Sequence, residues 1–231
     1  GLFTAAKELA LSAAKEQVKY LEVRFAPSFS TGQGLSIHDI IESVNRGLKS
    51  AEEKADIMTG IIVCGMRHLD METNLSMLKE ARELFGEGVV GCDLAGDEKA
   101  FPTSSFEEFF AAAKKYGMPF TIHSGECQSV LNIQTAIDFG AKRIGHGIAM
   151  QGQKDVIQLC KEKGIGVELC PTSNYQTKAL EKGAVYPLQE FYDAGLMLSV
   201  NTDNRMVSGT TCTDEYMLLN EMGMMNERMT E

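Results

Sequence analysis

The sequence predicts a parallel α/β fold, and three observations carry this prediction. A segment with the helical spacing of apolar residues follows each short apolar run along the chain. No linker rich in Pro, Gly and Ser and no shift in composition interrupts the alternation, which favours one domain over residues 1–231. The predicted strands begin near residues 20, 59, 89, 119, 143, 165 and 197. The first alternates apolar and charged residues, whereas those at 59 and 89 are continuous apolar runs, as expected for strands covered on both faces.

This alternation is typical of a TIM-type (β/α)8 barrel, which would use nearly all of the 231 residues. The barrel has eight strands, whereas the sequence supplies seven, and the chain opens on a helix expected at residues 3–18. We therefore expect a barrel without its first strand, or an open sheet.

The helices between the strands are predicted from apolar periodicity and from their boundary residues. Ser36 with Asp39 three residues later is a weak capping pattern, and it starts a helix expected at residues 36–56. Gly117 and Pro119 end a helix expected at residues 101–116. The remaining helices are expected at residues 73–85, 130–139, 154–163, 188–193 and 214–225.

Composition excludes several classes of function. The net charge is −10 and no basic stretch occurs, which argues against a nucleic-acid partner. No apolar run approaches the ~18 residues that span a membrane, and no signal-peptide pattern is present. The six cysteines form no Cys-x-x-Cys pair, so we expect reduced cysteines in a cytoplasmic protein that binds a small molecule. The oligomeric state is left open.

Polar residues stand where four of the predicted strands end. Because the carboxyl ends of parallel strands meet at one rim, we expect these side chains to converge there. Histidine and carboxylate ligands suit zinc or a similar divalent ion, with one position left for water. The remaining two histidines, His38 and His68, are expected at the surface. The residues at the rim are Asp93, Gly96, His123, Glu126, His146, Asp203 and Asn204.

Five short segments of the sequence resemble the motifs of one family. They occur in family order, together with an early strand at residues 20–27 that also matches. The chain is similar to adenosine deaminases, which are metal-dependent (β/α)8-barrel enzymes of the amidohydrolase group. The matching motifs are DLAGDE (93–98), TIHSGE (121–126), RIGHG (143–147), ELCPTSN (168–174) and VNTD (200–203).

The resemblance implies hydrolytic deamination of adenosine, and of 2'-deoxyadenosine, to inosine and ammonia. His123 and Asp203 would bind one catalytic Zn²⁺, which activates a water, so that Asp203 is also counted as catalytic. Glu126 would donate a proton to purine N1 and help protonate the leaving ammonia. His146 would orient the water and stabilise developing charge, and the backbone N–H of Gly96 would bind purine N3.

The sequence departs from the family pattern at two places. Asn204 stands where many members have an aspartate that binds purine N7, and its amide can donate to N7 without being protonated. No His-x-His pair occurs, although the family's first strand supplies two metal ligands in this way. We therefore expect a chain that lacks strand 1 and most of the C-terminal helices of the family.

Two alternative functions stay open. The chain could belong to another aminopurine deaminase, such as an adenine deaminase, or it could be a catalytically incompetent purine-binding fragment that lacks metal ligands. Zinc deaminases of polynucleotides are disfavoured because the sequence has neither His-x-Glu nor Pro-Cys-x-x-Cys.

Overall fold

The computed structural model describes residues 1–32, 34–181 and 183–225. The chain divides into two compact units, each of which is described separately. The first unit comprises residues 1–97 and 105–121, and the second comprises residues 98–104 and 122–231. The expectation of a single domain over residues 1–231 stays a prediction.

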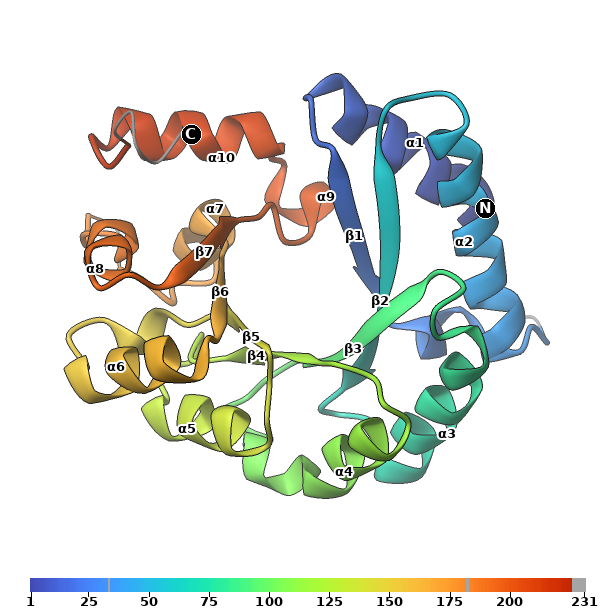
Figure 1. Ribbon diagram of the computed structural model, residues 1–231, viewed down its shortest axis with the longest axis horizontal. Coiled ribbons are helices and arrows are strands. Elements are labelled where there is room, and N and C mark those ends of the chain that lie inside the picture. The colour runs from blue at the N-terminus through green and yellow to red at the C-terminus, as the bar shows by residue number, and fades with distance from the viewer. Residues whose placement is uncertain (33, 182, 226–231) are drawn as a thin grey trace. The chain divides into compact units, whose positions relative to one another are not determined.

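A parallel sheet of three strands forms the centre of the first unit, in the order β1 (Tyr20–Phe25), β2 (Met58–Met66) and β3 (Val89–Ala95) (Figure 1). Residues 59–65 of β2 are all buried, as expected for a strand covered on both faces. The register between β2 and β3 shifts between Ile61 and Ile62. The continuous apolar run at residues 59–65 thus forms the buried strand that it predicts, whereas β1 is only partly buried.

Helices accompany this sheet, and their ends follow the boundary residues of the sequence. Ser36 and Asp39 form a complete capping box, in which each side chain accepts from the backbone N–H of the other residue. Asp70 caps the next helix by accepting from the Thr73 N–H at 2.7 Å. The helices are α1 (Leu2–Lys15), α2 (Ile37–Glu52), α3 (Met71–Ala81) and α4 (Glu107–Lys115), with short 3₁₀ turns η1 (Pro27–Ser30) and η2 (Arg82–Leu84).

The second unit contains a sheet of four strands, in the order β4 (Thr121–Ser124), β5 (Arg143–His146), β6 (Gly166–Leu169) and β7 (Met197–Val200). The β5–β6 and β6–β7 pairs are parallel. Its helices are α5 (Val130–Asp138), α6 (Lys154–Lys163), α7 (Pro171–Gln176), α8 (Leu188–Asp193), α9 (Arg205–Ser208) and α10 (Cys212–Glu221), with the 3₁₀ turn η4 at Ile148–Met150. A further 3₁₀ turn, η3 (Thr103–Phe106), contains the boundary between the two units in the sequence.

The strands begin within two residues of their predicted starts, and the expected helices are present with small changes at their ends. The segment expected to be one helix at residues 101–116 forms η3 followed by α4, and the last helix begins at Cys212 and ends at Glu221. The short helices α7 and α9 were not predicted. Within the described ranges, no helix combines the length and apolarity that crossing a bilayer requires.

Candidate active site

The turn after β4 is tightly constrained by its glycine. Gly125 has φ +79°, and a Cβ placed there would overlap the Ile133 side chain. Only glycine combines this backbone conformation with this close approach to α5. The backbone therefore reverses direction directly after β4. His123 precedes this tight turn, and Glu126 follows it three residues later.

A buried carboxylate holds this turn from another loop. Glu98, which is 5% exposed, accepts hydrogen bonds from the backbone N–H of Gly125 at 3.0 Å and of Cys127 at 2.8 Å. The amide nitrogen of Asn132 donates to the same carboxylate at 3.1 Å, and the amide oxygen of Asn132 accepts from the Thr103 N–H at 3.0 Å. The carboxylate thus satisfies donors on both sides of Glu126 and fixes the turn that carries it.

His146 lies at the end of β5 in a left-handed conformation, with φ +66°. The residue is 1% exposed, and the centroid of its ring lies 5.1 Å from that of the His123 ring. A non-glycine residue in this region of φ and ψ is strained and needs support from its surroundings. The structure brings the two predicted histidines together within the second unit.

Both ring nitrogens of His146 face polar partners. Nδ1 lies 2.9 Å from the Asn174 amide nitrogen, and Nε2 lies 3.6 Å from Oε2 of Glu126. The hydroxyl of Tyr186 in turn donates to Oδ1 of Asn174 at 3.0 Å. Burial raises the pKa of the Tyr186 hydroxyl well above 10, so that it keeps its proton.

Glu126 has one further partner besides His146. The hydroxyl of Thr177 donates to Oε1 of Glu126 at 2.9 Å, while Oε2 faces the imidazole. The Glu126 side chain is 28% exposed. It is therefore anchored at one oxygen and still accessible to a small molecule.

Asp203 and Asn204 follow β7 and lead into α9. Asp203 has φ +52°, and its carboxylate accepts from the Ser173 hydroxyl at 2.7 Å. Asn204 is the N-cap of α9, because its Oδ1 accepts from the Val207 N–H at 3.2 Å. The cap occupies the amide oxygen, so the amide nitrogen is the group that remains to bind an acceptor.

Gly96 and Asp93 belong to the first unit. Gly96 has φ +113°, and a Cβ placed there would lie 3.4 Å from Cβ of Arg67. Asp93 lies within β3 and not beyond its end; its fully buried carboxylate is 3.3 Å from Nη1 of Arg24. Asp93 therefore has an ion-pair partner inside the first unit.

The described residues contain one set of three side chains whose ligand atoms lie within 4.8 Å of one another, namely His38, Asp39 and Glu42. Asp39 is already engaged by Ser36, whose hydrogen bonds lower its pKa. His123 and Asp203 are not part of such a set within these ranges. They have the donor types of a zinc site but supply fewer than the three protein ligands of a catalytic centre.

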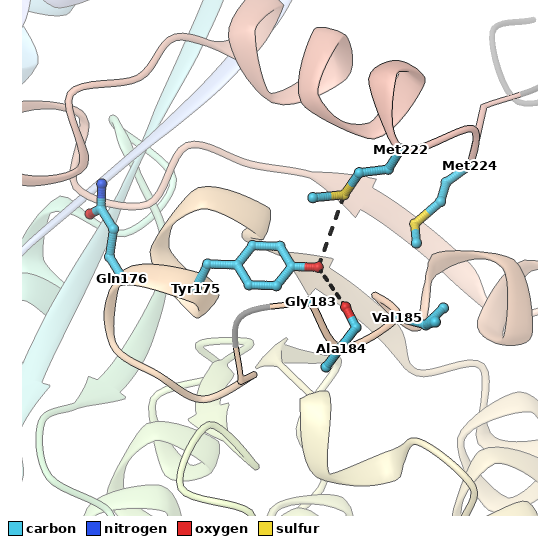
Figure 2. A pocket seen from close by; sticks show the side chains of 7 residues that line it. All are labelled: Tyr175, Gln176, Gly183, Ala184, Val185, Met222 and Met224. Atoms are coloured by element: carbon cyan, nitrogen blue, oxygen red, sulfur yellow. Dashed lines mark hydrogen bonds between the residues drawn. The ribbon is translucent and has the colours of Figure 1, made fainter.

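A separate cavity of about 570 Å³ lies in the second unit, lined chiefly by Tyr175, Val185, Met222 and Met224 (Figure 2). The Tyr175 hydroxyl donates to the carbonyl oxygen of Ala184 at 3.1 Å. The lining includes none of the predicted site residues. The sequence did not reveal this cavity, and methionine-rich segments are more often packing than binding surfaces.

Sequence reasoning missed the supporting residues of the site. Glu98 and Asn174 were visible only as parts of the matching motifs, because nothing local reveals their distant partners. Tyr186 and Thr177 had no signal in the sequence. A buried tyrosine needs a hydrogen-bond partner, but the partner cannot be identified before the fold is known.

Comparison with known proteins places the chain in a family. The family model described as "Adenosine deaminase" matches residues 2–231. Proteins named adenosine deaminase from Enterococcus faecalis and Lacticaseibacillus casei are 44% and 43% identical over 94% and 92% of this chain. The chain spans 65% and 62% of the length of these two relatives.

Solved structures agree with the predicted fold. The N6-methyl-AMP deaminase of Arabidopsis thaliana matches with a TM-score of 0.88 and 29% identity, covering 99% of this chain and 69% of that one. An adenine deaminase of Arthrobacter aurescens gives a TM-score of 0.86 and 27% identity, covering 95% and 67%. The α/β fold class of a partial (β/α) barrel is thereby confirmed, and the chain belongs to the adenosine deaminase family.

Proposed function

We propose that the protein to which this chain belongs hydrolyses adenosine, and 2'-deoxyadenosine, to inosine and ammonia. One observation carries the proposal: the Glu126 carboxyl group stands 3.6 Å from the buried His146 imidazole, and the centroid of that imidazole lies 5.1 Å from the centroid of the His123 ring. The identity of 42–44% to proteins named adenosine deaminase supports the same activity. A proton donor and a second polar group at one place are what replacement of an amine by water requires.

We further propose that His123 and Asp203 bind a divalent metal ion, with Zn²⁺ as the expected ion. Imidazole and carboxylate are suitable ligands, and the Ser173 hydroxyl that donates to Asp203 would orient the carboxylate as a supporting hydrogen bond. When bound, such an ion lowers the pKa of a water ligand and so supplies a nucleophile near neutral pH. The remaining ligands would come from residues other than these two.

The chain's own residues perform the proton transfers. Glu126, in its carboxylic acid form, donates a proton to purine N1, and the carboxylate then helps to transfer a proton to the departing amine. The exposure of Glu126 and the anchoring of one oxygen by Thr177 suit a group that must reach a bound purine. His146 orients the attacking water and stabilises the charge that develops on oxygen. One water is consumed, and one ammonia leaves.

One group of the second unit would recognise the purine ring. The Asn204 amide nitrogen would donate to N7, and this role is compatible with the cap that its oxygen forms on α9. This contact selects a purine with unprotonated N7. Gly96 belongs to the first unit, and its contact with purine N3 stays a prediction from the family resemblance.

A specific observation favours a second candidate substrate class. The similar Arabidopsis structures include an N6-methyl-AMP deaminase and a protein in complex with IMP or GMP. A purine 5'-monophosphate is therefore an alternative, although the identity to those proteins is only 28–29%. We also propose a cytoplasmic location, which the six free cysteines support because disulfides are rare in that reducing compartment.

Ammonia release from purified chain loaded with Zn²⁺ tests the proposal. Adenosine, adenine, AMP and N6-methyl-AMP are compared as substrates, and bound metal is measured in parallel. We expect adenosine to have the highest kcat/KM and Glu126→Gln to abolish turnover while metal stays bound. Substitution of the exposed Glu83 by Gln is the matched control. Bound metal and purine without turnover would support the non-catalytic alternative.

A further inference from the structure

We propose that Tyr186 and Asn174 are positioning residues that hold the His146 imidazole in the tautomer with its proton on Nε2. The inference deepens the proposed function, on which its kinetic part rests. It concerns three side chains of the second unit that are almost completely excluded from solvent. The exposed fractions are 1% for Tyr186, 0% for Asn174 and 1% for His146.

The contact between Tyr186 and Asn174 sets the direction of the hydrogen bonds. The Tyr186 hydroxyl lies 3.0 Å from Oδ1 of Asn174. An amide oxygen can only accept, so the Tyr186 hydroxyl donates its proton there. The Asn174 amide is thereby oriented with its oxygen toward Tyr186.

An amide oriented in this way leaves one role for the imidazole. The Asn174 nitrogen is a donor and lies 2.9 Å from Nδ1 of His146. Nδ1 must therefore accept, and the ring proton of the neutral imidazole is on Nε2. The opposite tautomer would set two donors against each other in a buried site, where neither could find an acceptor.

The other side of the ring agrees with this tautomer. Nε2 faces Oε2 of Glu126 at 3.6 Å, so an N–H at this atom points toward an oxygen of the Glu126 carboxyl group. The hydrogen bonds from Tyr186 through Asn174 to His146 form a relay. This relay presents the Nε2 N–H as a donor beside Glu126, the proposed proton-transfer group, which suits the role of stabilising charge on oxygen.

Tyr186→Phe tests the relay, because it removes one hydroxyl and keeps the ring. Tyr175→Phe is the matched control, since the hydroxyl of Tyr175 bonds Ala184 at the separate cavity (Figure 2). We expect Tyr186→Phe to lower kcat by about 10- to 100-fold with KM changed less than about threefold, as supporting hydrogen bonds of functional histidines typically do. We expect Tyr175→Phe to retain parental kcat.

The tautomer itself is read from ¹⁵N NMR of the imidazole nitrogens in the full chain labelled at its four histidines. We expect His146 to have protonated Nε2 and unprotonated Nδ1, and Tyr186→Phe to mix the two tautomers. Asn174→Asp is a second, nearly isosteric variant, whose carboxylate accepts from the ring and should move the proton to Nδ1.

Protonated Nδ1 in the parent, or ring signals unchanged in Tyr186→Phe, would overturn the proposal. So would unchanged signals in Asn174→Asp, and the amide spectrum of each variant verifies folding. Because this readout needs no substrate, it decides the relay even if the chain turns over no purine.

Discussion

Replacing Glu98 by Gln tests whether one buried carboxylate holds the turn that carries Glu126. The substitution keeps the shape of the side chain and removes its charge. In the parent, Oε1 accepts from the Cys127 N–H, and Oε2 accepts from the Gly125 N–H and from the Asn132 amide. No orientation of a Gln amide can accept at both positions, because one of its two polar atoms is a donor.

The expected loss of unfolding free energy follows from these three hydrogen bonds. In the better orientation, the amide oxygen replaces Oε2 and the NH₂ group faces the Cys127 N–H. The lost bond and the opposed donors cost about 1–3 kcal/mol. The two remaining bonds change from a charged to a neutral acceptor, which weakens each by about 1 kcal/mol. We expect the free energy of unfolding to fall by about 4 kcal/mol, a large part of the ~5–15 kcal/mol typical of a domain.

Urea unfolding at pH 7, followed by far-ultraviolet circular dichroism, measures this change. Glu83→Gln is the control for the chemical substitution, because Glu83 is exposed, and it should change stability by less than about 0.5 kcal/mol. A Glu98→Gln variant within about 1 kcal/mol of the parent would refute the reasoning, since one neutral hydrogen bond could then account for the whole effect.

Three further predictions concern residues around the site. Asn204→Ala should raise KM for adenosine and leave metal content unchanged if, as proposed, its amide nitrogen binds the purine; an unchanged KM would remove Asn204 from the site. Gly125→Ala should destabilise the protein by about 2–4 kcal/mol through strain at positive φ and overlap with Ile133, whereas Gly152→Ala, at φ +75° in open space, should cost only about 1 kcal/mol in urea unfolding. Burial, and then the charge of Glu98, raise the pKa of the Cys127 thiol to about 11. Since only the thiolate reacts, the rate of alkylation of Cys127 followed by peptide mass spectrometry should keep rising up to about pH 11 and should level off at lower pH in Glu98→Gln; a plateau near pH 9 in the parent would contradict this.

The sheet strands were predictable because their signal is local. The continuous apolar runs at residues 59–65 and 89–96 indicated strands covered on both faces; residues 59–65 are all buried, and β3 is buried except at Val90 and Ala95. Helix α7 was missed because it begins with Pro171 and consists mostly of polar residues, without apolar periodicity. Its hydrogen bonds to His146 and Asp203 can be recognised only in three dimensions.

The candidate site was predictable in part for the same reason. His123, Glu126 and His146 could be identified because parallel strands bring their carboxyl ends to one edge. The left-handed backbone at His146 and Asp203 could not, since neither residue type requires positive φ. The supporting contact between Tyr186 and Asn174 depends on residues twelve positions apart whose side chains meet only after folding.

The proposed deamination is tested most directly by the source of the oxygen in the product. The chain loaded with Zn²⁺ is incubated with adenosine in ¹⁸O-labelled water, and the purine is analysed by mass spectrometry. The account predicts inosine carrying one ¹⁸O atom at C6, with none formed by Glu126→Gln. Recovery of unchanged adenosine, or of inosine without the label, would contradict hydrolysis at this site.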